Sequence, residues 1–190
     1  CFGTTSVYNA EAVTENTLFR LASMTKPITA IATLILVDRG QLSLSDKVID
    51  YLPEFKNVHI TQISDNNEII DFGEAQNDIT ICHLLTHTSG IGSDAAKSQK
   101  MTDEDKKSIA NTIEFHAKIG LDFEPGTKQK YSGTGAFDVL VKIIENITKT
   151  DYLHFLQQEI FEPCQMVNTT FIPTGAQWKQ IIAMHNKVDG

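Results

Sequence analysis

The sequence has little of what membrane proteins, nucleic-acid-binding proteins and disulfide-stabilised domains require. Its longest apolar run, residues 28–37, is about half of the roughly 20 residues that span a bilayer. Lysine and arginine number 16 against 24 acidic residues, and the net charge of −8 offers no basic stripe for phosphates. The three cysteines (Cys1, Cys82 and Cys164) are widely spaced and define no disulfide framework or zinc knuckle. We therefore expect no membrane span and no nucleic-acid partner.

What the sequence does contain is typical of a globular domain. A length of 190 residues suits one domain or part of a larger one. The content of 41% hydrophobic and 21% charged residues is ordinary for such a protein. Cys82 falls in an apolar helical pattern, so we expect it to be a small buried hydrophobic residue.

The most informative segment places Ser23 three residues before Lys26, directly ahead of Pro27. Residues at this spacing share one helix face, so the lysine amine can reach the serine hydroxyl. The proline ring would clash with the carbonyl of Ser23, four residues back, unless the helix begins close to that serine. Ser23 is therefore expected at a helix N-terminus, where free N–H groups favour developing negative charge. A nucleophilic serine activated by a nearby base suits this position.

The remaining pattern is mostly helical. The helix that starts near Ser23 is apolar almost all round, which predicts a buried helix that ends at Gly40. Thr102 with Asp105 forms a variant capping box, and Gly120 is a natural stop for the helix that it opens. We further expect a short strand over residues 1–8, a short helix capped by Ser45 within residues 42–53, a hairpin or excursion over residues 55–79, and helices over residues 80–87, 102–119, 134–148 and 151–161.

Five ordered segments together resemble one protein family. Residues 18–27 (LFRLASMTKP) look like the nucleophile segment of the serine β-lactamase and penicillin-binding-protein superfamily. The resemblance is greatest to the branch that contains class C β-lactamases, D-peptidases and related carboxylesterases. The further segments, in order, are residues 40–55 (GQLSLSD and YLPEF), residues 83–90 (HLLTHTSG), residues 124–132 (EPGT and YS) and residues 161–166 (FEPCQM).

The resemblance implies the fold and the extent of the domain. The fold is α/β plus all-α, the serine β-lactamase/DD-peptidase-like fold, with mostly its helical part and the nucleophile helix present. Residues 1–190 form a partial domain: a short strand and the nucleophile helix in residues 1–40, and a helical region with an excursion in residues 41–190. The C-terminal sheet strands of the family, with its third motif, lie beyond residue 190. The resemblance also suggests a place outside the cytoplasm, in the periplasm or at the cell surface.

The same resemblance gives roles to individual residues. Ser23 attacks an acyl carbonyl and forms an acyl-enzyme, and Lys26 shuttles or orients the proton. Tyr131 stands where the family has the tyrosine of its Tyr-x-Asn motif, and is the general base for Ser23. Ser132 and Gly133 complete that motif and are expected to contact the substrate.

Gly133 departs from the family pattern, which has asparagine at this position. Without a side chain it can neither bond to a substrate amide nor steady the lysine. We therefore expect hydrolysis of a small-molecule ester, β-lactam or D-amino-acid peptide, with a leaning to carboxylic esters. The alternative function is that of a non-catalytic penicillin-binding sensor or scaffold. No metal or organic cofactor is implied.

Two other polar patterns have simpler interpretations. His83 and His87 have the spacing of zinc ligands on a helix, but Leu84 stands where the metalloprotease pattern needs glutamate. We expect these histidines to pack and form hydrogen bonds around residues 88–90. Glu114 and His116 are expected on a solvated helix face.

Overall fold

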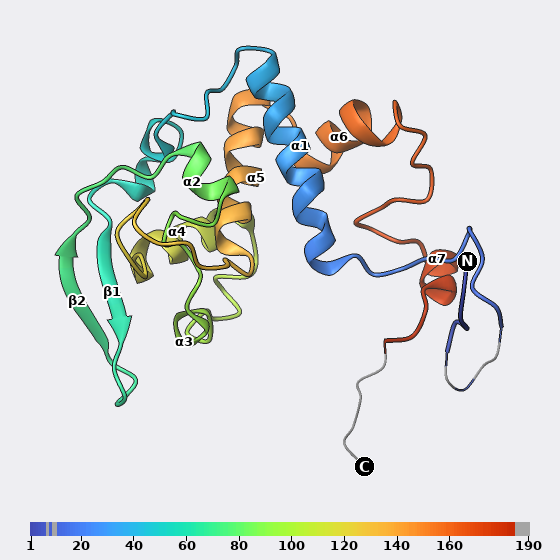
Figure 1. Cartoon of the computed structure of the whole chain (residues 1–190), viewed down its shortest axis with the longest axis horizontal. Coiled ribbons are helices and arrows are strands. Elements are labelled where there is room, and N and C mark those ends of the chain that lie inside the picture. The colour runs from blue at the N-terminus through green and yellow to red at the C-terminus, as the bar shows by residue number, and fades with distance from the viewer. Residues whose placement is uncertain (7, 9–10, 185–190) are drawn as a thin grey trace.

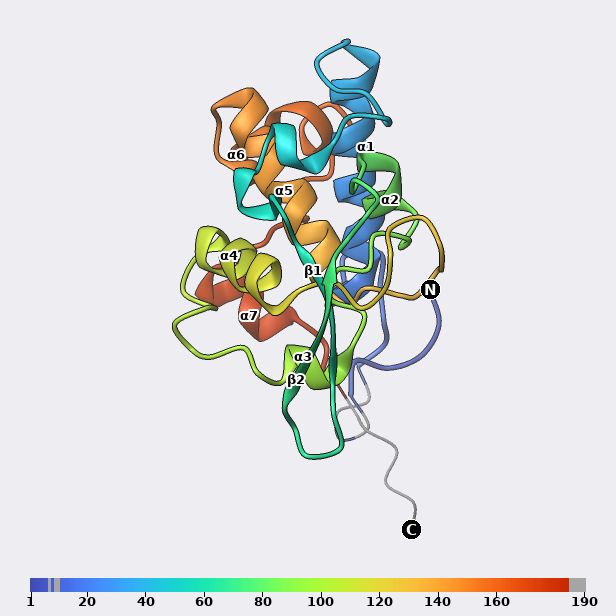
Figure 2. The same ribbon diagram turned by 90° about the vertical axis from the view of Figure 1, so that its left-hand side faces the viewer.

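Two long helices, α1 (Thr25–Asp38) and α5 (Gly135–Thr148), lie side by side at the centre of the structure (Figures 1 and 2). The structure is a computed structural model that describes residues 1–6, 8 and 11–184. A hairpin of two strands projects on one side of this pair, and α7 lies on the other (Figure 1). The other elements are β1 (His59–Ile63), β2 (Ile69–Glu74), α2 (Ile81–Leu85), α3 (Ala95–Ser98), α4 (Ile109–Ile119), α6 (Tyr152–Leu156) and α7 (Gly175–Gln180).

Helix α5 supplies the largest share of the core. Its apolar residues recur every three or four positions, so they form one stripe that faces the neighbouring helices. The stripe contacts α1, α2, α4 and α6, which surround it. Its buried members are Ala136, Phe137, Val139, Leu140, Ile143 and Ile144.

Helix α1 is buried on only one face. Ala32, Thr33 and Leu36 are fully buried, whereas Ile31 and Leu34 keep 49% and 47% of their surface exposed. The expectation of a helix buried all round is therefore wrong for the described residues. Its C-terminal limit is close to the predicted one, because α1 ends at Asp38 and Gly40 follows with φ 66°.

The excursion expected over residues 55–79 is the antiparallel hairpin of β1 and β2. Its register pairs Ile63 with Ile69 near the turn, and an irregularity lies between His59 and Thr61. The hairpin joins the body of the protein through the backbone N–H of Thr61, which donates to the carbonyl of Leu121 at 2.8 Å.

Two N-terminal predictions are wrong. In the described part of residues 1–8 no strand forms, and a single antiparallel bridge joins Thr4 to Ala12; residue 7 lies outside the described residues. Residues 42–53 form 3₁₀ turns at Val48–Asp50 and from Pro53 onward rather than a helix capped by Ser45. The carboxylate of Asp46 orders this segment instead, by accepting hydrogen bonds from the N–H of Ser43 (2.8 Å) and the hydroxyl of Tyr51 (2.7 Å).

The start of α4 also differs from the prediction. Thr102 and Asp105 do form reciprocal hydrogen bonds, but these close a separate turn, and the helix begins at Ile109 with Ser108 as its N-cap. The predicted stop at Gly120 is confirmed, with φ 82°. Cys82 is exposed rather than buried, because the core-facing side of α2 is formed by Ile81 and Leu84.

The helices expected over residues 80–87, 134–148 and 151–161 are present with small shifts of their bounds. Thr80 caps α2, and Asp151 caps α6 by accepting from the N–H groups of Leu153 and His154. Helix α6 continues as a π-helical turn at Gln157–Phe161. Helix α7 was not predicted, although Thr174 and Gln177 form a capping box at its start.

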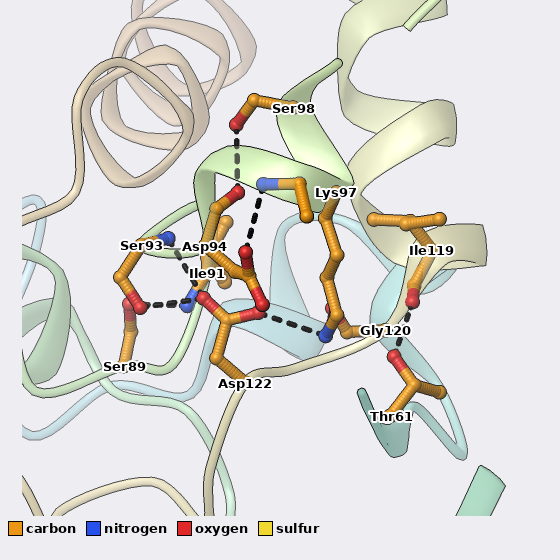
Figure 3. A network of polar contacts seen from close by, with 11 residues as sticks. Thr61, Ser89, Ile91, Ser93, Asp94, Lys97, Ser98, Ile119, Gly120 and Asp122 are labelled. Atoms are coloured by element: carbon orange, nitrogen blue, oxygen red, sulfur yellow. Dashed lines mark hydrogen bonds and ion pairs between the residues drawn. The ribbon is translucent and has the colours of Figure 1, made fainter. Parts of the chain in front are cut away.

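A buried ion pair connects α3 to the segment that follows α4 (Figure 3). The Nζ of Lys97 lies 2.8 Å from Oδ1 of Asp122, and the two side chains are only 3% and 4% exposed. Lys97 also donates to the carbonyl of Gly120 (3.1 Å), and Asp122 accepts from the N–H and hydroxyl of Ser93. These bonds fix the loop around Ser93 against the end of α4.

His116 is buried, so its expected place on a solvated face is wrong. It is 3% exposed, and neither ring nitrogen has a hydrogen-bond partner among the described residues. Its ring packs against Gly92 and Gly135, so closely that a Cβ added to Gly135 would lie 2.8 Å from its Cε1. Burial lowers the pKa of His116 to about 4, although the Asp122 carboxylate acts in the opposite direction.

We expect removal of one member of the buried ion pair to be strongly destabilising. Asp122→Asn leaves the Lys97 ammonium buried without its counter-charge, and such losses cost about 3–5 kcal/mol. The apolar double variant Lys97→Met/Asp122→Leu should recover part of that loss. Lys118→Ala, which breaks an exposed ion pair with Glu114, is the control and should change little. Urea unfolding measures each; equal losses for Asp122→Asn and Lys118→Ala would contradict the expectation.

We also expect His116 to make stability depend on pH. Because the pKa of His116 is lower in the folded protein than the ordinary value of 6.5, the unfolded chain binds more protons between these values. The free energy of unfolding should therefore fall as pH drops from about 6.5 towards 4, by about 3 kcal/mol for this group. Urea unfolding at pH 7 and 4.5 should show a smaller decrease for His116→Leu; the same decrease in both proteins would refute this origin.

Candidate active site

Ser23 lies in a 3₁₀ turn, Ala22–Met24, directly before α1. Pro27 is the third residue of α1, so the carbonyl with which its ring would clash, that of Ser23, is outside the helix. This is the arrangement that the position of Pro27 predicted. Ala22 has φ 46°, a left-handed conformation that is uncommon for residues other than glycine and is often found at functional sites. The turn leaves the Ser23 side chain exposed.

The structure brings together the three residues predicted to be catalytic. The hydroxyl of Tyr131 donates to Oγ of Ser23 at 2.7 Å, and Nζ of Lys26 lies 3.5 Å from the same oxygen. Tyr131 and Ser23 are 108 positions apart, so only the fold unites them. A serine with a hydrogen-bonded phenol and a nearby ammonium has the elements of an activated nucleophile.

The electrostatics of the site favour ionisation of the tyrosine. The pKa of Tyr131 is lowered from its usual value of 10, mainly by its hydrogen bond to Lys26 and then by its bond to Ser23. Nζ of Lys26 lies 4.9 Å from the centre of the Tyr131 ring, where its positive charge stabilises a phenolate. A larger fraction of Tyr131 than of a free tyrosine is therefore ionised near neutral pH and available to accept a proton.

Gly133 holds the lysine through its main chain. Nζ of Lys26 donates to the carbonyl oxygen of Gly133 at 2.5 Å. The expectation that Gly133 cannot steady the lysine is therefore wrong, because the backbone carbonyl does what the side chain was expected to do. A Cβ added to Gly133 would meet nothing within 4 Å, so a side chain at this position would extend into open space.

Ser132 is placed differently from the other residues of the motif. It is 1% exposed, and its Oγ accepts a hydrogen bond from the N–H of Ala136 at 3.0 Å, in the first turn of α5. The expectation that it contacts the substrate is not supported by this position, because the hydroxyl is buried and bound to the helix.

His87 supports the Tyr131 loop. Its Nδ1 accepts from the N–H of Ser132 (3.1 Å), and its carbonyl accepts from the N–H of Lys130 (3.0 Å). The His87 ring packs against Tyr131 with ring centres 4.8 Å apart. Burial, and then the charge of Lys26, lower the pKa of His87, which keeps Nδ1 free to accept. In the described part of the chain, no three His, Cys, Asp or Glu side chains are grouped to hold a metal.

A cavity of about 380 Å³ opens beside Ser23, between α1 and α5. Sequence reasoning missed most of its lining, which comes from four segments far apart in the chain. One signal was available: Thr134, Asp138 and Val141 are spaced as one face of the predicted helix. The residues that line the cavity are Ala22, Ser23, Thr25, Lys26, Thr29, Gly133, Thr134, Phe137, Asp138, Val141, Tyr152 and Phe171.

Serine, lysine and tyrosine around the start of a helix, on this fold, define the class of penicillin-binding and β-lactamase-related serine hydrolases. The chain belongs to the Beta-lactamase family, whose profile matches residues 2–189. Esterase EstB of Burkholderia gladioli is 34% identical over 169 residues, which are 83% of this chain and 39% of the esterase. Protein flp of Staphylococcus aureus strain MW2 is 32% identical over 168 residues, 86% of this chain and 30% of that protein.

Solved structures agree on the fold. The β-lactamase/D-alanine carboxypeptidase from Yersinia pestis, complexed with citrate, is 28% identical with a TM-score of 0.74, over 96% of this chain and 48% of that one. EstCE1, a hydrolase with promiscuous acyltransferase activity, has a TM-score of 0.75 at 23% identity, over 95% of this chain and 46% of that one. The chain therefore has the serine β-lactamase/DD-peptidase-like fold. It spans less than half of the length of these proteins. Among the described residues, no helix is long and apolar enough to cross a membrane.

Proposed function

We propose that the whole protein hydrolyses carboxylic esters through an acyl-enzyme formed on Ser23. The observation that carries the proposal is the 2.7 Å hydrogen bond between Tyr131 and Ser23, with the Lys26 ammonium beside both. The 34% identity to the esterase from B. gladioli supports the choice of esters among the substrates of the family.

The reaction follows from these contacts. Tyr131, ionised with the help of Lys26, takes the proton of Ser23 as Oγ attacks the acyl carbon. The carbon–oxygen bond to the leaving alcohol then breaks, and Tyr131 returns its proton to that alcohol. A water molecule attacks the resulting ester in the same way, which releases the acid and restores the Ser23 hydroxyl. Lys26, held by the Gly133 carbonyl, stabilises the negative charge on Tyr131 in each step.

The alternative is a sensor or scaffold that is acylated but does not turn over. A non-catalytic binder need not keep a nucleophile, a base and a lysine together, whereas turnover uses the base twice, first to activate the serine and then to activate water. The contact of Tyr131 with both Ser23 and Lys26 favours turnover. A single burst of product with stable labelling would support the sensor instead.

Ser23→Ala should abolish acylation of the whole protein. Loss of the nucleophile removes the covalent step, so kcat for a p-nitrophenyl ester should fall by at least about a thousandfold. Ser45→Ala, which removes another exposed hydroxyl, is the matched control and should behave as wild type. Labelling with a fluorophosphonate, located by mass spectrometry, provides the second measurement. Near-wild-type turnover by Ser23→Ala would rule out the assignment.

The side chain missing at position 133 should set the preference for esters. We expect a higher kcat/KM for a short p-nitrophenyl ester than for a chromogenic cephalosporin, because no amide group at residue 133 bonds the acylamino group of the latter. Gly133→Asn has room for its side chain and leaves the carbonyl contact with Lys26 in place. It should therefore raise the cephalosporin-to-ester ratio about tenfold.

Gly133→Ala is the matched control, since it fills the space without adding an amide. Its ratio should stay near that of wild type. A cephalosporin that is the better substrate of the unmodified protein would make the esterase preference wrong and favour β-lactam hydrolysis.

A further inference from the structure

The cavity beside Ser23 contains a carboxylate that the proposed reaction does not use. Asp138 lies in the first turn of α5 and lines the cavity together with Thr134 and Val141. Thr134 stands four positions before Asp138 and Val141 three positions after it, so all three share one helix face. Helix geometry and the cavity lining thus agree that Asp138 faces the space next to the nucleophile.

Lys26, the basic residue that lines this cavity, is already bound to other groups. Lys26 donates to the Gly133 carbonyl at 2.5 Å and lies 3.5 Å from the Ser23 oxygen. Its charge lowers the pKa of Asp138, as does a hydrogen bond from Thr134, but burial has the larger effect and raises that pKa. The carboxylate is therefore incompletely compensated by the protein, and a positive group from outside would stabilise it.

Aromatic rings complete this part of the cavity. Tyr152 and Phe171 line it in an edge-to-face pair with centres 6.1 Å apart. The Tyr152 hydroxyl is hydrogen-bonded to Thr29 at 2.7 Å, which holds the ring in place. Aromatic faces beside a carboxylate are the surroundings in which proteins bind organic cations. Nζ of Lys26 already lies 5.6 Å from the centre of the Phe137 ring. The rings of Tyr152 and Phe171 are therefore the ones available to a ligand.

We propose that Asp138, with Tyr152 and Phe171, selects esters that carry a positively charged group on the part of the substrate that enters this cavity. The inference rests on the proposed ester hydrolysis at Ser23, and it adds a substrate class to that function. Asp138 acts here as a specificity residue: it contacts the cationic group and takes no part in proton transfer.

The test compares esters that differ only in charge. One pair is butyrylcholine and its neutral isostere 3,3-dimethylbutyl butanoate, which carry the difference on the alcohol. The other pair is 4-nitrophenyl 4-(trimethylammonio)butanoate and 4-nitrophenyl 5,5-dimethylhexanoate, which carry it on the acyl group. The kcat/KM of each ester is measured with the whole protein, with Asp138→Asn and with Asp103→Asn.

In at least one pair the cationic ester should be preferred about tenfold. Asp138→Asn should remove that preference through a higher KM for the cationic ester, with the neutral ester little changed. Asp103→Asn removes an equal charge from a fully exposed position, so it should retain the preference. Asp138→Ser, which is smaller and also neutral, should match Asp138→Asn.

The preference should also depend on pH. Protonation of Asp138 removes the attraction, so the cationic-to-neutral ratio should decrease on the acid side, at a higher pH than for an ordinary aspartate. Lys26 from α1 and Tyr152 from α6 are the other ionisable groups of the cavity. Burial raises the pKa of Tyr152, so it stays neutral in this range. The ratio should be flat with pH in Asp138→Asn.

Each outcome decides between specific alternatives. If neither ester of a pair is hydrolysed and Ser23 is not labelled, the proposed function itself fails. If both are hydrolysed equally by wild type, or if Asp138→Asn lowers both to the same extent, the specificity role is overturned while ester hydrolysis stands. The last result would make Asp138 a counter-charge for Lys26 instead.

Discussion

The packing of α1 against α5 is the constraint on which the rest of the structure depends. Ser23, the proposed nucleophile, lies in the turn directly before α1 and Lys26 in its first turn, whereas Tyr131 and the Gly133 carbonyl that holds Lys26 come from the loop that leads into α5. The face of α1 turned to the core carries small residues such as Thr29, Ala32 and Thr33, which let the two helices approach closely. The hydrogen bonds of the site tolerate shifts of only a few tenths of an ångström, so this packing sets the geometry of the candidate active site.

A second set of polar contacts supports the loop that leads into α5. The Lys97–Asp122 pair holds the segment around Ser93, and the carbonyl of Gly92 in that segment accepts from the N–H of Gly133 at 3.4 Å. His116 packs against Gly92 as well as Gly135. Replacing a whole buried pair by apolar residues often costs little stability, whereas removing one partner costs much, so these contacts hold the Ser93 segment and, through Gly92, the loop that carries Tyr131.

The sequence predicted the parts of the structure that local rules determine. Pro27 located the start of α1, Gly120 located the end of α4, and the spacing of Ser23 and Lys26 predicted that the amine reaches the hydroxyl. It failed where tertiary contacts prevail over local signals. Thr102 and Asp105 form hydrogen bonds with each other in a turn that does not start a helix. His116 is buried, whereas Cys82 is exposed. Tyr131, unlike Lys26, was inferable as a partner of Ser23 from family resemblance alone, since nothing local links Ser23 to a residue 108 positions away.

The lysine's acceptor at position 133 has a consequence for how such proteins diversify. Because a main-chain carbonyl holds Lys26, and not a side chain, any residue at position 133 that keeps the local backbone leaves the ammonium where it is. A side chain introduced at this position would extend into open space and would not be needed to hold Lys26. Substitutions at this one position can therefore change which ligands are bound and leave the contacts of Lys26 and Ser23 unchanged. Ligand recognition and the proposed reactivity of Ser23 can then evolve separately.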